Sequence, residues 1–202
     1  MIWDDNEDIV RIECTNSARV IQQHLNELRE ERRPYVFITN TMNIKPLHRI
    51  LVPVSMLEED TYKAEICTYL ARKTGAHIIL LQANDYGSHA RQNVNRIVTH
   101  INAVNEKLQH LSSNSNNAPT TDVAGTPISY EIVPARKNSF KLMQEAAERQ
   151  RDFQHDLLVI TASRDYGLDD LLFGPPERKA IQHALVPVML VNPREDLFSL
   201  CD

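Results

Sequence analysis

Short apolar runs alternate with amphipathic stretches along most of the chain, and the last two runs display the pattern most clearly. Residues 157–160 and 187–191 are apolar, end at turn signals and are separated by a short helical segment. Such runs are typical of buried parallel strands joined by a crossover helix. The polar loop 161–176 follows the first run, and open α/β sheets bind ligands at the carboxyl ends of their strands. We therefore expect any ligand site to lie beside this loop.

Five apolar runs alternate with four helical patterns between residues 47 and 193. The strands are expected at 50–54, 77–81, 128–133, 157–160 and 187–191, and the helices at 59–74, 89–112, 139–153 and after Pro176. Gly75 is expected to end the first of these helices, because glycine readily adopts the left-handed conformation of a helix C-terminus. Right-handed crossovers then predict an α/β fold, a five-stranded parallel twisted sheet with helices on both faces.

Residues 8–40 form a compact β-α-β pattern ahead of this domain. A strand is expected at 9–12, a helix from Asn16 or Ser17 to about Arg33, and a second strand at 35–38. Asparagine and serine favour a helix start because their side-chain oxygens accept bonds from free amides of the first turn. We therefore divide the chain into an N-terminal β-α-β appendage, residues 1–43, and a larger domain, residues 44–202.

The appendage is similar to the last crossover unit, which indicates an internal repeat. The matched segments are Asp8–Ile12 with Asp156–Ile160, Ile21-Gln22 with Ile181-Gln182, and Pro34–Ile38 with Pro187–Val191. The first copy lacks a loop of about the length of 164–175, and its helix is predicted to be about two turns longer. Two unrelated β-α-β units also share such features by chance, so both readings stay open.

Composition and charge restrict the partners. The formal net charge is −5 and the pI is near 5.9, so the mean field of the protein does not attract nucleic acid or an anionic membrane. No apolar run approaches the roughly 18 residues of a membrane span. The acidic start is unlike a signal peptide, and Cys14, Cys67 and Cys201 are too widely spaced for a disulfide framework. These features predict a cytoplasmic protein.

Residues for catalysis or metal binding are sparse. The eight histidines are scattered and lack the spacing of a helical zinc site. Ser55, Ser163 and His183 lack the strained elbow that activates a nucleophile. Residues 112–127 are polar, have almost nothing to bury and are expected to be mobile. We therefore predict no catalytic residue and no metal site.

The order of the elements, the strands Ile50–Val54 and Pro187–Val191, and the loop ending in Gly174 resemble the universal stress protein family. The resemblance covers about residues 47–193 and, through the repeat, weakly 8–40. It implies the strand order 3-2-1-4-5 and a last strand that forms dimers. It also implies that the appendage is a truncated first half, as in tandem members whose two halves mimic the dimer of single-domain ones.

The last strand, Val188–Val191, is expected to pair antiparallel at this interface. Its partner is either the same strand of a second chain, in a homodimer, or Tyr35–Ile38 of its own chain, in a pseudo-dimer. The interface residues are predicted to be Tyr35, Phe37, Val188 and Leu190.

The phosphate loop departs from that of ATP-binding members, which carry Gly-x2-Gly-x9-Gly-Ser/Thr after the fourth strand. With Gly174 as the third glycine, Thr161 and Arg164 replace the first two, and Pro175 replaces the hydroxyl residue. Pro175 and Pro176 have no amide hydrogen for a phosphate at a helix N-terminus. These members also carry an Asp just past the first strand, where Ser55 stands here. The loop therefore predicts a degenerate phosphate site.

Two functions follow from this comparison. The first is a regulatory binding module that acts through dimer or partner contacts, with no cofactor and without conventional ATP binding. The second is an atypical protein that binds ATP or AMP and has slow phosphohydrolase activity, in which Arg164, Arg178 and Lys179 replace the lost amides. The candidate ligand-binding residues are Pro53, Val54, Ser55, Ala83, Asn84, Ser163, Arg164 and Gly174.

Overall fold

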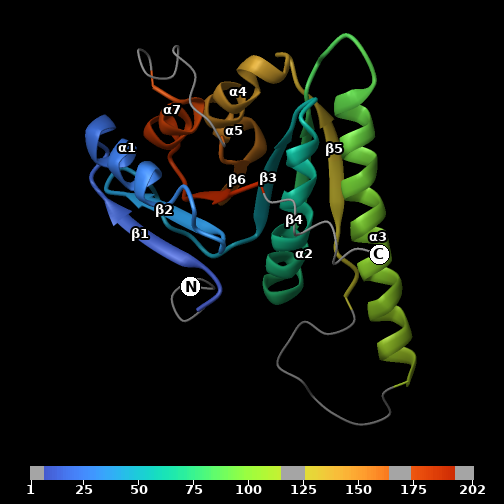
Figure 1. The fold of residues 1–202 in the computed structure, drawn as a ribbon. Helices are drawn as coiled ribbons and strands as arrows, with labels where there is room; N and C mark the ends of the chain where they lie inside the picture. The colour runs from blue at the N-terminus through green and yellow to red at the C-terminus, as the bar shows by residue number, and fades with distance from the viewer. Residues whose placement is uncertain (1–6, 115–125, 164–173, 194–202) are drawn as a thin grey trace.

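The computed structural model of the protein describes residues 7–114, 126–163 and 174–193, and these residues form one sheet with helices on both faces (Figure 1). The sheet has seven described strands in the order β1-β2-β7-β6-β3-β4-β5. The strands are β1 (Val10–Cys14), β2 (Tyr35–Thr39), β3 (Arg49–Val54), β4 (His77–Gln82), β5 (Tyr130–Pro134), β6 (Leu157–Thr161) and β7 (Val188–Val191).

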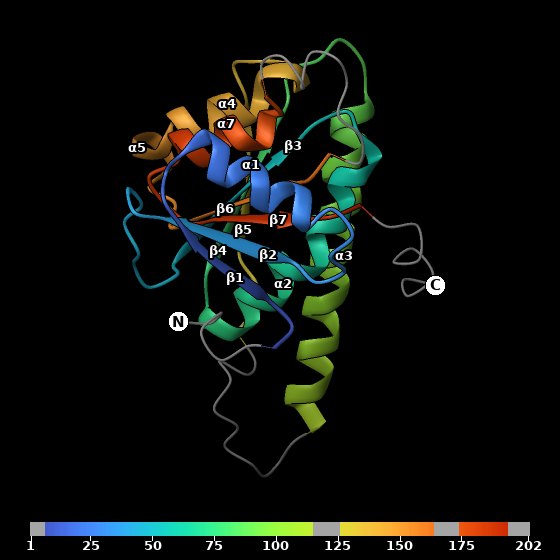
Figure 2. The ribbon, with the colours of Figure 1, turned by 60° about the vertical axis from the view of Figure 1, so that its left-hand side comes forward.

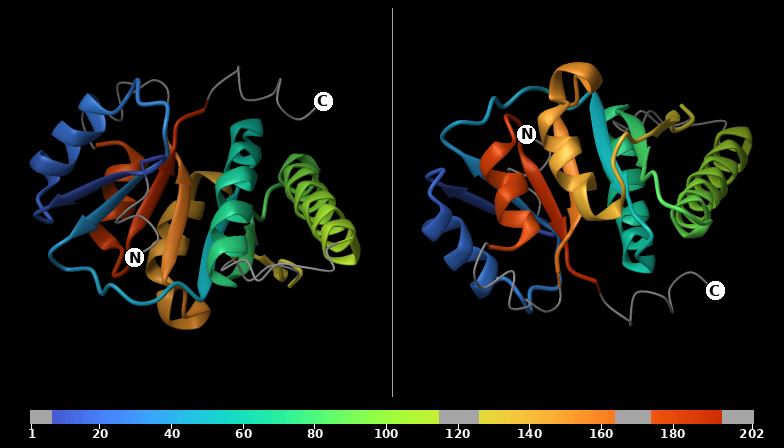
Figure 3. Two further views of the ribbon diagram at one scale, coloured as in Figure 1. Left: turned by 90° about the horizontal axis from the view of Figure 1, so that it is seen from below. Right: turned by 90° about the horizontal axis from the view of Figure 1, so that it is seen from above.

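Helices cover the two faces unequally (Figures 2 and 3). One face carries the 3-10 helix η1 (Glu58–Tyr62), α2 (Lys63–Thr74) and the long α3 (His89–Asn114). The other face carries α1 (Ala18–Glu27), the 3-10 helix η2 (Ser139–Lys141), α4 (Leu142–Glu148), α5 (Gln150–Phe153) and α7 (Pro176–His183). No described helix, α3 included, has the length and apolar character needed to cross a membrane.

The predicted α/β fold is confirmed. Strands β3 to β7 are all parallel and lie in the order β5-β4-β3-β6-β7, which is the expected 3-2-1-4-5. The strand count differs from the prediction, because both strands of the appendage join the same sheet and extend it from five strands to seven. An open edge of β7 would leave a row of backbone N–H and C=O groups unpaired. Strand β2 supplies their partners.

The pairing of β2 with β7 is antiparallel and nearly symmetric. Val36 lies opposite Met189, Tyr35 opposite Leu190, and Phe37 opposite Val188. The sequence repeat matches Val36 with Met189, Tyr35 with Val188 and Phe37 with Leu190. Tyr35 pairs with Leu190, and the residues that match these two in the repeat, Val188 and Phe37, also pair with each other. This exchange is what an isologous two-fold contact produces. The Val36–Met189 pair lies at the centre of this local two-fold relation.

Two asparagines add side-chain bonds across the same contact. Asn16, just before α1, donates from Nδ2 to the carbonyl of Gln182 in α7 at 3.1 Å. Asn192, just after β7, donates from Nδ2 to the carbonyl of Leu28, at the end of α1, at 2.8 Å. Each unit thus binds the helix of the other, in addition to the shared strand ladder.

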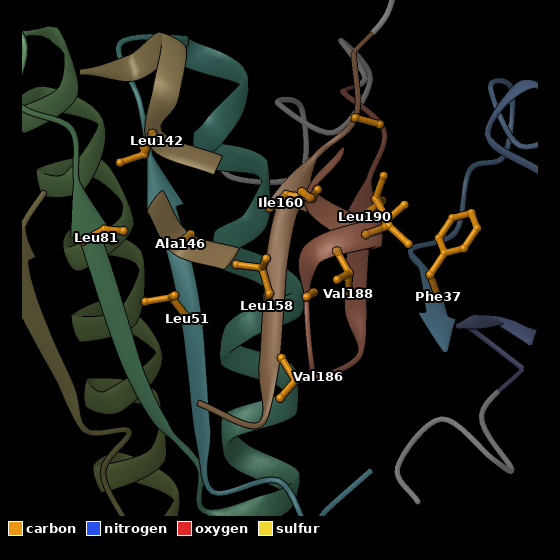
Figure 4. Packing of buried hydrophobic residues seen from close by; sticks show 14 of the residues in the cluster. Phe37, Leu51, Leu81, Leu142, Ala146, Leu158, Ile160, Val186, Val188 and Leu190 are labelled. Atoms are coloured by element: carbon orange, nitrogen blue, oxygen red, sulfur yellow. The ribbon is translucent and has the colours of Figure 1, made fainter. Parts of the chain in front are cut away.

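The core consists of two layers, one on each face of the sheet. The layer beneath α1, α4 and α7 joins the appendage to the larger domain, since Phe37 lies in one cluster with Leu158, Val188 and Leu190 (Figure 4). Phe37 is fully buried and meets the Tyr35 ring edge to face, with the ring centroids 6.1 Å apart.

Several helix ends differ from the predictions. Helix α1 ends at Glu27 and not near Arg33, because the Glu31 carboxylate accepts bonds from the Arg32 and Arg33 amides and closes a turn. The helix is therefore not two turns longer than α7, and that prediction is wrong. The single helix expected over 139–153 is broken into η2, α4 and α5. Gly75 ends α2 as predicted, with a φ of 74°. Residues 115–125 of the segment predicted to be mobile lie outside the described residues.

We predict that Phe37→Ala lowers the free energy of unfolding by about 3–5 kcal/mol, because it removes a large side chain from a closed core. Phe140→Ala is the control, since Phe140 is 82% exposed and surface changes cost within about 0.5 kcal/mol. Urea unfolding of both variants and the wild type measures the difference. Equal losses in the two variants would contradict the buried β2–β7 contact.

Candidate functional site

A cavity of about 420 Å³ lies at the carboxyl ends of β3 and β6. Its walls come from these two strand ends, from η1 and the start of α2, and from η2 and α4. It is lined by Pro53, Ser55, Met56, Leu57, Glu59, Asp60, Lys63, Ser139, Phe140, Leu142, Met143, Ile160, Thr161, Ala162, Ser163 and Pro193. This is the edge of the sheet where the sequence predicts a ligand, at the point where the strand order reverses.

A buried ion pair forms part of the cavity wall. Lys63 is 1% exposed and Asp60 is 6% exposed, and the Lys63 Nζ lies 2.6 Å from Asp60 Oδ1. The Lys63 ammonium also donates to the Pro53 carbonyl. The Thr161 hydroxyl donates to Asp60 Oδ1 at 2.8 Å, which ties η1 to the end of β6. Both charges are therefore already paired inside the protein.

The charge state of Asp60 follows from two opposed effects. Burial penalises the charged form, but the Lys63 charge and bonds from Lys63 and Ser55 outweigh it and hold the pKa of the carboxyl below its usual range. The carboxylate is therefore ionised at neutral pH.

The end of β3 is held by the same carboxylate. The Ser55 backbone amide donates to Asp60 Oδ2 at 2.5 Å, and Asn93 of α3 donates to the carbonyls of Ser55 and Leu57. A carboxylate therefore does lie at the end of β3, although Ser55 replaces the Asp that the family resemblance implies. It is supplied from five positions further along the chain and serves as an internal acceptor.

The start of α7 carries a second buried carboxylate. Pro175 precedes the helix and Pro176 is its first residue. Glu177 is fully buried, and its Oε1 accepts a bond from the backbone amide of Ser163, just after β6. A helix N-terminus attracts anions, and here a carboxylate of the protein itself takes that position.

Gly174 is favoured by its positive φ, and the end of the Arg178 side chain lies against it. Its φ is +76°, and a Cβ at this position would lie 1.8 Å from the guanidinium of Arg178. The Arg178 side chain therefore packs directly over the Gly174 backbone, beside Glu177 at the first turn of α7. The carboxylate and the guanidinium bring opposite charges to the same place.

The mouth of the cavity exposes large apolar side chains. Met56, Leu57 and Phe140 all line it and are among the exposed large hydrophobic residues of the described chain. The Ser139 hydroxyl accepts a bond from the Met56 amide at 2.9 Å and donates to Asp85 Oδ2. Three loops, which follow β3, β4 and β5, are thus joined beneath an apolar rim.

The structure brings together only some of the predicted ligand residues. Pro53, Ser55 and Ser163 line the cavity, whereas Val54 and Ala83 are buried and Asn84 is exposed, and none of these three lines it. Gly174 lies at the start of α7, and Arg164 lies outside the described residues. The four predicted interface residues, Tyr35, Phe37, Val188 and Leu190, are placed opposite one another in β2 and β7 of one chain.

Sequence reasoning missed Asp60, Lys63 and Glu177. Asp60 and Glu177 stand in charged runs, Glu58-Glu59-Asp60 and Glu177-Arg178-Lys179, which usually indicate a solvated face, and Lys63 is an isolated lysine in a helical pattern. The spacing of Asp60 and Lys63, three apart at a helix start, is the one available signal, and it does not distinguish a buried pair from an exposed one. Within the described residues there is no group of three or more His, Cys, Asp or Glu side chains arranged for a metal ion.

Comparison with known families agrees with this geometry. Residues 46–192 match the model of the Universal stress protein family. The match covers well over half of the chain, so the chain belongs to the universal stress protein family. Membership supports a stress-related regulatory or nucleotide-binding module. Comparison with curated proteins finds no match.

Solved structures align with this chain at low sequence identity. A universal stress protein from Archaeoglobus fulgidus aligns at 12% identity and a TM-score of 0.60, over 95% of this chain and 63% of that one. A universal stress protein in complex with cAMP aligns at 12% identity and 0.49, over 74% and 100%. A putative universal stress protein from Pseudomonas aeruginosa aligns at 14% identity and 0.47, over 96% and 66%. The chain therefore spans about two thirds of two of these three proteins.

We predict that Lys63→Met lowers the free energy of unfolding by about 3–5 kcal/mol at pH 7, because it leaves a buried carboxylate without its partner. Lys137→Met is the matched control, since the exposed Lys137–Glu148 pair, with nitrogen and oxygen 3.3 Å apart, is worth less than about 1 kcal/mol. The Asp60→Asn/Lys63→Met double variant is expected to recover part of the loss. Equal costs for the two lysine variants would contradict a buried pair.

The difference in the free energy of unfolding between the wild type and Lys63→Met is expected to depend on pH. Because the folded-state pKa of Asp60 is lowered, its contribution to stability is present above the unfolded value and is lost as the pH falls through the folded value. Without Lys63 the buried carboxyl protonates more readily and needs no counter-charge. Urea unfolding from pH 7 to 3 should therefore show the gap narrowing in acid, and a gap that widens would refute the assignment.

Proposed function

We propose that this chain is a regulatory module of the universal stress protein family that acts through contacts with proteins and lacks conventional ATP binding. One observation carries the proposal: the Ser163 amide, at the exit of β6, is already bonded to the buried Glu177 carboxylate. Pro175 and Pro176 add no amide hydrogens at the adjacent helix start. A phosphate placed there finds three potential backbone donors missing or in use.

The loss of these hydrogen bonds is large enough to reduce nucleotide affinity strongly. A hydrogen bond contributes about 0.5–1.5 kcal/mol, and more where one partner is charged. Three missing donors therefore cost about 4 kcal/mol, which is roughly a thousandfold in affinity. Asp60 does not replace them, since a carboxylate repels phosphate and this one is already paired with Lys63.

Contact with other proteins is supported by the rim of the cavity. The exposed Met56, Leu57 and Phe140 give the rim an apolar surface at the edge of the sheet that carries the cavity. The edge of β7, where the resemblance implies a dimer contact, is paired with β2.

We also infer that the appendage stands for the last crossover unit of a second protomer, which makes the chain a pseudo-dimer. The symmetric β2–β7 register and the reciprocal bonds of Asn16 and Asn192 support this assignment. A chain of this kind has no need of a homodimer through β7. A cytoplasmic location, without nucleic acid or membrane partners, remains a prediction.

The second candidate function is an atypical nucleotide-binding protein with slow phosphohydrolase activity. It is favoured by the Arg178 guanidinium, which lies against Gly174 at the start of α7. In this alternative Arg178, with Arg164 and Lys179, binds phosphate by side-chain charge. The neighbouring Glu177 carboxylate opposes it.

We predict that titration with ATP, ADP and AMP up to about 1 mM, a range typical of weak ligands, leaves the amide resonances of Ser163 and Gly174 unshifted. Nuclear magnetic resonance reports on these two positions directly, so binding elsewhere on the protein does not confuse the result. Arg164→Ala is compared with Arg19→Ala, which removes the same charge from exposed α1. Resonance shifts that saturate at micromolar nucleotide and disappear only in Arg164→Ala would overturn the proposal in favour of the second candidate.

A further inference from the structure

A second cavity, of about 710 Å³, lies at the opposite edge of the sheet from the first. Arg49 begins β3 and Asp156 directly precedes β6, so this cavity lies at the amino ends of the two strands whose carboxyl ends form the first one. It is lined by Asn43, Lys45, His48, Arg49, Gln150, Arg151, Gln154, His155, Asp156 and Val186. The segment after β2, the start of β3 and the end of α5 therefore meet here.

The lining residues carry buried polar atoms that have no hydrogen-bond partner among the described residues. These atoms are Arg49 Nε, Gln150 Oε1 and His155 Nδ1. The His155 side chain is 3% exposed. Buried polar groups are nearly always satisfied by protein, water or ligand, and leaving one unsatisfied costs about as much as a lost hydrogen bond. All three residues line the cavity, but none of the three atoms is open to a water-sized group, so they are polar atoms packed within its wall.

The charges around the cavity favour an anion. Lys45 and Arg151 are exposed on its rim and Arg49 is half-buried in its wall, whereas Asp156 is the one carboxylate that lines it. The Oδ2 atom of that carboxylate is engaged within the protein, because it accepts bonds from the His48 and Arg49 amides at 2.9 and 3.0 Å. Arg49 also pairs with Glu131, outside the cavity, at 2.9 Å. Lys45 and Arg151 thus remain as cations for an incoming group.

His155 adds a group that responds to the occupant. Burial lowers the pKa of the imidazole to about 4, with Asp156 raising it and Arg49 lowering it. The ring is therefore neutral at pH 7 and offers one donor and one acceptor. An anion bound nearby favours the charged ring and raises this pKa.

We propose that the cavity bounded by Lys45, Arg49, Arg151 and His155 is a binding site for a small oxyanion. The oxyanion pairs with the arginine and lysine side chains. The site lies at the other edge of the sheet and does not depend on the proposed function of the first cavity.

The test is a titration of the full-length protein with inorganic phosphate, in which the nuclear magnetic resonance signal of the His155 ring reports binding. We expect a saturable shift and a rise in the pKa of His155. Arg151→Ala is expected to weaken binding by about tenfold or more, because it removes a charge-assisted bond. Arg136→Ala removes the same charge from a side chain that is 75% exposed and does not line the cavity, and is expected to change affinity by less than about twofold.

No saturable shift at His155, or equal weakening by Arg151→Ala and Arg136→Ala, would overturn the site.

Discussion

The antiparallel contact between β2 and β7 is the interaction on which the arrangement of the chain depends. Strand β7 is short and buried, and without a partner its outer edge would present free backbone groups to any other strand. Strand β2 closes this edge from within the chain, and the aromatic and aliphatic side chains of the two strands complete a core layer shared with α1 and α7. The appendage is thereby an integral part of the domain's sheet.

The two ends of strands β3 and β6 differ in chemical character because different groups occupy them. At the carboxyl ends of β3 and β6, Asp60, Lys63 and Glu177 are buried and paired with groups of the protein itself, so the cavity keeps its place in the fold but offers few free donors. At the amino ends of the same strands, cationic side chains lie beside buried polar atoms without described partners. The fold thus separates a closed site from an open one along the same two strands.

The sequence was sufficient to predict the crossover helices and the helix end at Gly75, since each depends on local patterns of apolar residues and glycine, whereas the strand order was implied by the family resemblance. It also placed prolines at the start of α7, and a proline has no amide hydrogen wherever it stands in a fold. It did not predict the roles of Asp60, Lys63 and Glu177, because charged residues look alike in sequence whether they are buried in pairs or solvated. The end of α1 was misplaced because the turn is closed by Glu31, a side-chain contact that carries no periodic signal.

The most direct test of the central contact is a disulfide between Val36→Cys and Met189→Cys, which lie opposite each other in β2 and β7. The three native cysteines are replaced by alanine, and each single-cysteine variant serves as a control. After mild oxidation and denaturation without reductant, mass spectrometry reports whether the link lies within one chain or between two. The account predicts an intrachain link in the double variant at every protein concentration. A covalent dimer linking the 36 and 189 positions of different chains would contradict it.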